Sequence, residues 1–142
     1  MTTTWDRTIT LPKSTLRWWS PARGVLCSEI TGHMTVEVVE PLITSFVAVY
    51  DDRPGNKVKT FHDWRAATGY DSAARVAYTE AAKPLMVHVD TIEFLLASRI
   101  VAMGVEVAKI VLGQALSASV DWPTFERRRQ EAIEAGGRRP GF

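Results

Sequence analysis

Apolar and polar residues alternate along the first thirty residues of the chain, as they do in β-strands that have one buried face. The alternating runs cover residues 8–11, 16–19 and 25–30. Pro12 and the segment 21–24, which reads PARG, separate these runs and have turn composition. We therefore predict that the chain begins with a meander of three strands.

The apolar spacing changes to three and four residues after Thr35, which is typical of a helix with one buried face. The residues of this stripe are Val39, Leu42, Ile43, Phe46, Val47 and Tyr50. Pro41 lies inside the stripe, so the helix either begins near Glu40 or bends one turn in. Residues 51–56 have loop composition, and the alternation over residues 57–62 predicts a strand.

The second half of the chain alternates helical and extended patterns. Helices are predicted from Ser72 to the region of Pro84, which ends, kinks or shortens the helix, then after Ser98 up to Gly113, and after Asp121 up to residue 136. Strands are predicted over residues 91–97 and 115–120. Such alternation requires crossover connections and therefore parallel strands. We predict an α/β fold, a single domain over residues 1–136 with a mixed β-sheet and about four helices, followed by a flexible basic tail over residues 137–142.

Composition indicates the cellular compartment and argues against several classes of partner. The chain has 142 residues, 46% of them hydrophobic, and its 17 Lys and Arg nearly balance 16 Asp and Glu, so no overall field favours a nucleic-acid partner. The single cysteine, Cys27, reads as a small buried hydrophobe, which fits a reducing compartment. The N-terminus lacks a signal-peptide pattern, and charged residues interrupt the apolar region 92–116. We expect a cytoplasmic protein without a membrane span.

The residue types that perform chemistry do not gather into a known constellation. His33, His62 and His88 lie far apart without metal-ligand spacing, and no Gly-rich phosphate loop is present. His62 and Asp63 look like a catalytic pair, but neighbours on a strand point to opposite faces. We therefore predict no catalytic residue, no metal and no cofactor, and a protein that is not an enzyme.

One corner, Tyr70-Asp71-Ser72, stands out because it places a carboxylate and a hydroxyl at the start of a helix. Asp71 in this position can accept hydrogen bonds from the free amides of the first helical turn. A phosphate on Ser72 would also be favoured there by the helix dipole. The corner is thus a candidate interaction or phosphorylation site.

Tryptophan is more frequent than a small core needs, with five in 142 residues. Trp18 and Trp19 are neighbours on a predicted strand, so one faces the core and the other faces the opposite side. Together with Trp64 they are candidates for an interface or for the wall of an apolar pocket. The flexible side chains of Met34, Met86 and Met103 are candidates to line such a pocket.

Three segments carry a family resemblance that covers roughly residues 24–136: GHMTVEVVEPLI, KVKTFHDW and GYDSAARV. In order and pattern they resemble a STAS-type domain of the sporulation anti-sigma factor antagonists, and in particular an uncharacterised bacterial SpoIIAA-like group. In that family the corner usually reads Asp-Ser-Ser-Gly and the second serine is phosphorylated by a partner kinase. Asp71 and Ser72 match the first two positions, whereas Ala73 and Ala74 replace the others. The resemblance thus implies a scaffold without the standard phosphoserine switch, unless Ser72 substitutes after a slip of one residue.

The resemblance implies a binding or regulatory module. Our first hypothesis is a non-enzymatic interaction module that binds an unidentified protein partner, or a second copy as a homodimer, through the corner. The alternative is a carrier or sensor of a small apolar ligand such as a lipid. The fold cannot choose between them, but an apolar groove beside the corner would favour the ligand, whereas a flat exposed patch would favour the partner.

Overall fold

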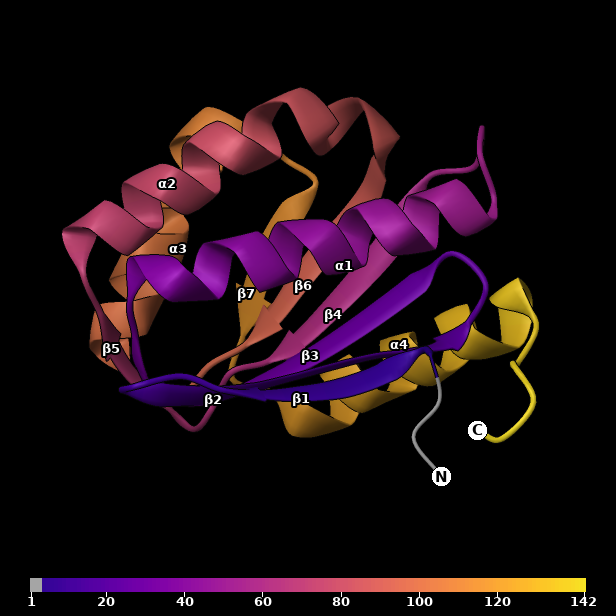
Figure 1. The fold of residues 1–142 in the computed structure, drawn as a ribbon, viewed down its shortest axis with the longest axis horizontal. Helices are drawn as coiled ribbons and strands as arrows, with labels where there is room; N and C mark the ends of the chain where they lie inside the picture. Colours follow the sequence, from indigo (N-terminus) through magenta and orange to yellow (C-terminus); the bar gives the residue numbers. More distant parts are fainter. Residues whose placement is uncertain (1–3) are drawn as a thin grey trace.

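The computed structural model describes residues 4–142, which form a mixed sheet with helices on both faces (Figure 1). The strands are β1 (Asp6–Thr10), β2 (Ser14–Ala22), β3 (Val25–Met34), β4 (Val58–Asp63), β5 (Ala67–Tyr70), β6 (Val89–Leu95) and β7 (Leu116–Ser119). The helices are α1 (Val39–Asp52), α2 (Ser72–Ala82), α3 (Arg99–Leu112) and α4 (Trp122–Gly136). Two short 3₁₀ helices, Val36–Val38 and Lys83–His88, precede α1 and follow α2.

The sheet confirms the predicted division into an antiparallel and a parallel half. Its order is β1-β2-β3-β4-β6-β7, with the first two pairings antiparallel and the next three parallel. The short strand β5 was not predicted, because its four residues read as a polar turn. It pairs in parallel with the end of β3, where Asp71 N donates to the carbonyl of Met34 at 2.9 Å. This pairing places the corner beside the carboxyl end of β3.

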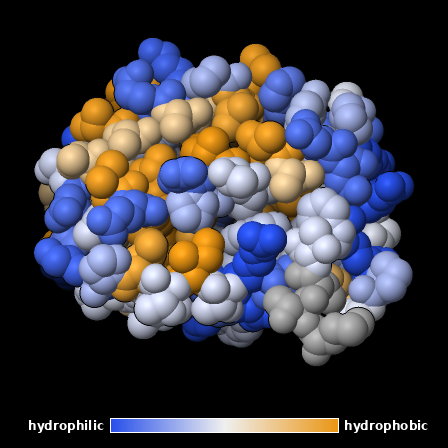
Figure 2. All heavy atoms as spheres, viewed as in Figure 1, coloured by the Kyte–Doolittle hydropathy of each residue, from blue (hydrophilic) through white to orange (hydrophobic). Residues whose placement is uncertain are grey.

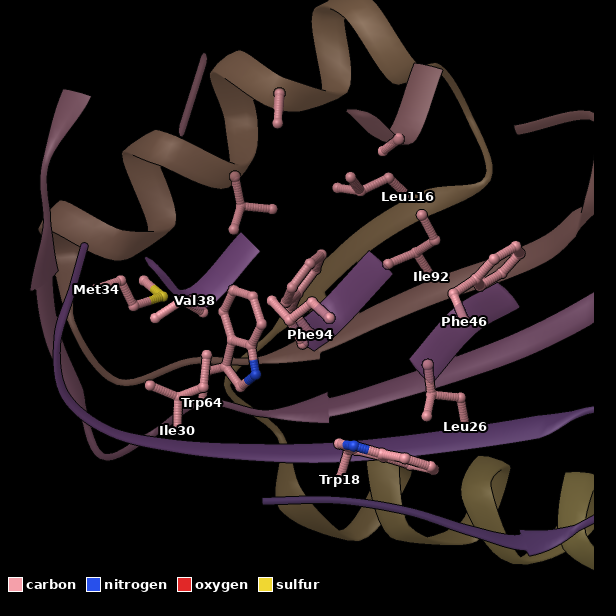
Figure 3. Close-up of a cluster of buried hydrophobic side chains, with 14 of the residues drawn as sticks. Trp18, Leu26, Ile30, Met34, Val38, Phe46, Trp64, Ile92, Phe94 and Leu116 are labelled. Carbon is pink, nitrogen blue, oxygen red and sulfur yellow. The ribbon is translucent and has the colours of Figure 1, made fainter. Parts of the chain in front are cut away.

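Helices α1, α2 and α3 cover one face of the sheet and α4 covers the other (Figure 1). Successive residues of β3 supply the two sides: Leu26 belongs to the larger core under the three helices, and Cys27 to the smaller core under α4. Figure 3 shows the larger core, in which the rings of Trp64 and Phe94 lie 4.8 Å apart. The predicted burial of Cys27 is confirmed, and that burial raises the pKa of its thiol to about 12.

The ends of the helices follow the local signals only in part. Pro41 occupies the first turn of α1, which begins one residue before Glu40, and Pro84 lies in the 3₁₀ helix after α2. Ser98 caps α3 as predicted, because its Oγ accepts from Val101 N at 3.3 Å. Asp121 occupies the N-cap position of α4, but its carboxylate accepts from the hydroxyl of Thr124 instead of a backbone amide.

One residue of the C-terminal segment 137–142, for which a flexible tail is predicted, is buried against the domain: Arg139. The side chain of Arg139 is 8% exposed, and its guanidinium donates two hydrogen bonds to Ser20 Oγ and lies 3.0 Å from a carboxylate oxygen of Asp52. The same guanidinium stacks 3.8 Å from the centroid of the Trp5 ring. These contacts join residues far apart in the sequence, so composition alone could not reveal them.

Candidate functional site

An apolar pocket lies between the sheet and helices α1, α2 and α3. Its walls come from the ends of several strands: Met34 ends β3, Tyr70 ends β5, Trp64 follows β4, and Phe94 lies near the end of β6. The carboxyl ends of parallel strands are where open α/β sheets generally bind ligands. The remaining lining residues are Thr35, Val38, Val39, Leu42, Ala74, Arg75, Tyr78, Val101, Gly104, Val105, Ala108 and Leu116.

The pocket is small in this conformation. Its volume is about 70 Å³, within about 560 Å³ of empty space that includes the opening to solvent. Sites for drug-sized ligands occupy roughly 300–1,000 Å³. The enclosed part therefore suits a small apolar group or the end of an alkyl chain. Figure 2 shows hydrophobic residues gathered in the upper half of the view, over the region that α1 and α2 cover in Figure 1.

A second cavity of about 30 Å³ lies further along the same core. Leu42 and Tyr78 line both cavities and so separate them. Of the three methionines expected to line a cavity, Met34 borders the first and Met86 the second. The expectation is wrong for Met103, which is 66% exposed because it lies on the outer face of α3.

Few polar groups reach the first pocket. The hydroxyl of Thr35 is buried and has no hydrogen-bond partner among residues 4–142. Burial raises the pKa of the Tyr78 hydroxyl to about 12, so it stays neutral at physiological pH. Among the described residues, the one charged side chain in the lining is that of Arg75. The pocket thus offers apolar contact and a small number of hydrogen-bonding groups.

A chain of buried hydrogen bonds runs below the pocket and includes His62. The Trp64 indole N–H donates to Ser28 Oγ at 2.9 Å, and Ser28 Oγ lies 2.5 Å from His62 Nδ1. His62 Nε2 lies 3.1 Å from Thr60 Oγ1, which donates to the carbonyl of Thr91 at 3.4 Å. Every donor is used if neutral His62 carries its proton on Nε2 and accepts at Nδ1 from Ser28.

This environment determines the protonation of His62. The ring is 4% exposed and stacks on Phe94, and burial lowers its pKa to about 3. Asp63 points away, as expected from strand geometry, and binds the Arg65 guanidinium at 2.7 and 2.8 Å. Ser28 is fully buried. The Ser28–His62 contact therefore belongs to the core, and it could not be predicted because Ser28 lies inside an apolar strand pattern.

The corner is placed beside the pocket, but Asp71 does not act as expected. Asp71 occupies the N-cap position of α2 with extended backbone, yet its side chain accepts no backbone amide. Its carboxylate instead binds His33 Nε2 at 2.7 Å, because β5 brings the corner next to the end of β3. Ser72 is exposed. Tyr70 lies against Gly104 of α3, where an added Cβ would come within 2.7 Å of the ring.

The singled-out tryptophans are mainly part of the two cores. Trp18 is 7% exposed in the larger core, while Trp19 packs half-buried against the smaller one, which confirms that the two neighbours face opposite sides. Trp64 is 6% exposed and lines the pocket. The most exposed of the described tryptophans is Trp122, at 38%, which the sequence did not single out. It begins α4, and the guanidinium of Arg65 lies 4.7 Å from the centroid of its ring.

Comparison with known proteins supports the fold and no more than the fold. No family model and no curated protein matches the chain. Among solved structures, the chain is similar to an uncharacterized DUF3478-family protein with a SpoIIAA-like fold from Shewanella loihica PV-4. The TM-score is 0.56 at 10% identity, covering 94% of this chain and 98% of the other. The expected STAS-like architecture is thereby confirmed as a SpoIIAA-like fold. No helix within residues 4–142 is long and apolar enough to span a bilayer.

Proposed function

We propose that this chain is a non-enzymatic binding module that holds a small apolar ligand in the pocket between the sheet and helices α1, α2 and α3. The observation that carries the proposal is an apolar cavity beside the corner, at the carboxyl ends of the strands. A flat exposed patch there would have favoured a protein partner instead. The fold itself is used for many purposes and does not decide between them.

The lining indicates the chemistry of the ligand. The lining consists of Trp64, Phe94 and the aliphatic side chains around them. Burial of an apolar group against these side chains favours binding by roughly 25 cal/mol per Å² of apolar surface removed from water. The hydroxyl of Thr35, which has no hydrogen-bond partner within residues 4–142, would accept or donate one hydrogen bond, and Arg75 lies in the same lining. A small apolar molecule with one polar end therefore fits best.

Native mass spectrometry of the purified protein tests the proposal, together with titration of the fluorescent probe 1-anilinonaphthalene-8-sulfonate. The variant Ala108→Leu adds three carbons inside the pocket and should abolish both a co-purified mass and probe binding. Ile133→Phe is the matched control, because it also adds three carbons, and Ile133 is equally buried in the smaller core under α4 and lines neither cavity. Ala74→Val supplies a milder filling variant if Ala108→Leu does not fold.

The result against the proposal is equally clear. A wild-type protein that is always empty and does not bind the probe would contradict a ligand-binding role. So would equal loss of probe binding in Ala108→Leu and Ile133→Phe, because a general loosening of the core, and not the pocket, would then explain the signal.

A second candidate function is the interaction module that uses the corner Tyr70-Asp71-Ser72. It is supported by the exposure of Asp71 and Ser72 at the start of α2. Asp71→Ala and Ser72→Ala should then weaken recovery of the partners that co-purify with wild type. Glu80→Ala is the control, since Glu80 is exposed on the same helix away from the corner. Equal recovery with all three variants would exclude the corner as the recognition surface.

A further inference from the structure

A polar cleft lies at the other end of the sheet, where the parallel strands begin. It has a volume of about 370 Å³, against about 70 Å³ for the apolar pocket. The turn between β2 and β3, the loop between α1 and β4, the starts of β4 and β6, and the last turn of α4 surround it. The lining residues are Arg23, Gly24, Val25, Arg53, Asn56, Lys57, Lys59, Asp90, Ala132, Ala135 and Gly136.

Positive charge is concentrated around this cleft, although the whole chain carries a formal net charge of only +1. Four cationic side chains line it: Arg23, Arg53, Lys57 and Lys59. Asp90 supplies the one carboxylate in the lining from the part of the chain that the structure describes, and its oxygen lies 3.8 Å from Lys59 Nζ. The cleft therefore carries an excess of positive charge that the rest of the chain offsets.

Neighbouring carboxylates outside the lining do not remove this excess. Arg23 Nε lies 3.5 Å from Asp52, but the same carboxylate oxygen is 3.0 Å from the buried Arg139. Asp52 thus already compensates a charge that is more deeply buried than that of Arg23.

Stabilisation of helix ends explains only one of the four cations. Arg53 is the C-cap residue of α1, where positive charge favours the helix dipole. Arg23 belongs to a turn, Lys57 to a loop and Lys59 to a strand. Four cations from two separate stretches of the chain, the turn at Arg23 and residues 53–59, therefore line one hollow, and helix-end stabilisation accounts only for Arg53.

The backbone around the cleft is held in place before any ligand arrives. The turn residue Gly24 has φ +72°, and its carbonyl accepts from Lys59 N at 2.9 Å. A Cβ on Gly136 would come within 2.4 Å of the Arg23 carbonyl oxygen, so only glycine lets α4 approach the turn this closely. This approach places Ala132 and Ala135 in the wall of the cleft, where they supply small apolar surface next to the cations.

We propose that this cleft is a second binding site, for a small molecule that carries two or more linked phosphate groups. Arginine binds phosphate oxygens through paired N–H groups, and lysine adds compact positive charge. A ligand with more than one negative charge is required because Arg53 and Lys57 form no ion pair among residues 4–142, and Arg23 shares the carboxylate of Asp52 with Arg139. The small residues of α4 leave room for an organic part beside the phosphates.

The experiment is a calorimetric titration of the full chain with inorganic pyrophosphate and tripolyphosphate, with sulfate as the anion control. The double variant Arg53→Gln/Lys57→Gln should weaken pyrophosphate binding by about tenfold or more, because charge-assisted contacts are lost. Arg127→Gln/Lys83→Gln removes the same charge from exposed positions elsewhere and should bind pyrophosphate as wild type does. Both pairs are at the surface, so a thermal melt confirms folding in each case.

Three results would overturn the proposal: no pyrophosphate binding by wild type, sulfate binding as tightly as pyrophosphate, or equal weakening in both double variants. The last would show that only the overall charge matters. The outcome is independent of the apolar pocket, because Ala108→Leu should leave pyrophosphate binding unchanged.

Discussion

The two ends of the parallel strands differ in chemistry, although one sheet builds both. At the carboxyl ends, Trp64 and Phe94 face small helical residues, and an apolar pocket remains between them. At the amino ends, the turn and loop residues supply cations around a wider polar cleft. The strands themselves are mostly buried. The helices, turns and loops that connect them therefore make one cavity apolar and the other polar.

The apolar end is hollow because helix α3 presents small side chains to large ones. Gly104 and Ala108 lie one turn apart on the face of α3 that meets the pocket. A larger residue at position 108 would fill the space, whereas a Cβ at position 104 would come within 2.7 Å of the Tyr70 ring. Ala108 therefore leaves the pocket open, and Gly104 makes room for its Tyr70 wall.

The largest expected effect concerns His62, which lies in the apolar half of this comparison. Its pKa of about 3 in the folded protein is below its ordinary value of 6.5, so between these pH values the unfolded chain binds a proton that the folded chain refuses. The contribution of neutral His62 to the free energy of unfolding is therefore complete above pH 6.5. It falls as the pH is lowered towards 3, by at most about 1.4 kcal/mol per pH unit.

Urea denaturation between pH 7 and 4 measures this slope. His62→Leu should be less stable than wild type at pH 7, because Ser28 and Thr60 lose their partner, but its stability should fall less steeply with acid. If the free energy of unfolding of His62→Leu fell with acid as steeply as that of wild type, His62 would have to bind its proton in the folded state over this acidic range.

At the polar end, the next largest effect is expected from Arg139. Arg139→Ala removes the buried partner of Asp52 and the two hydrogen bonds to Ser20, so we expect a loss of about 3 kcal/mol in the free energy of unfolding. Arg138→Ala is the matched control, because Arg138 is the exposed neighbour and should change stability by less than about 0.5 kcal/mol. Chemical denaturation measures both free energies of unfolding. Equal losses in Arg139→Ala and Arg138→Ala would favour the flexible tail that the composition predicts.

A smaller effect on stability, with a larger one on binding, is expected for Gly104→Ala. The added Cβ forces the Tyr70 ring to move, while the helix gains about 1 kcal/mol of intrinsic propensity, so stability should change little. The displaced ring should alter the pocket and weaken binding of the fluorescent probe. Ala102→Ser, two residues earlier on α3 and outside the pocket lining, serves as the control. Unaltered probe binding in Gly104→Ala would mean that Tyr70 is not a functional wall of the pocket.

Most of the fold could be predicted from the sequence, whereas the sites could be predicted only in part. The alternating strands and the three-and-four spacing of the helices report burial directly, which is why the mixed sheet was expected before the structure. Strand β5 was missed because four residues carry too little periodicity. The corner was found through its local signal, and Trp64 and Met34 were singled out as pocket candidates.

The remaining features depend on contacts between distant segments. The Ser28–His62 contact joins β3 to β4, and the cleft brings Arg23 and Arg53 together from different connections. In sequence these residues are scattered polar positions. The buried role of Arg139 was hidden for the same reason. Local patterns thus predict elements, but convergent side chains require the pairing of strands to be known.

The smallest expected effect concerns the N-cap residues of α2 and α3. Ser98 accepts a hydrogen bond from a backbone amide of α3, whereas Asp71 occupies the N-cap position of α2 without accepting one. Ser98→Ala removes a hydrogen bond to the first turn of α3 and should cost about 1 kcal/mol. Asp71→Ala removes only the exposed pair with His33, and should cost about 0.5 kcal/mol or less. In a double-mutant cycle, Asp71→Ala and His33→Ala should be coupled by nearly all of that value. A cost for Asp71→Ala that matches Ser98→Ala, without coupling to His33, would show that Asp71 caps α2 in solution and that the corner is held by the helix and not by β3.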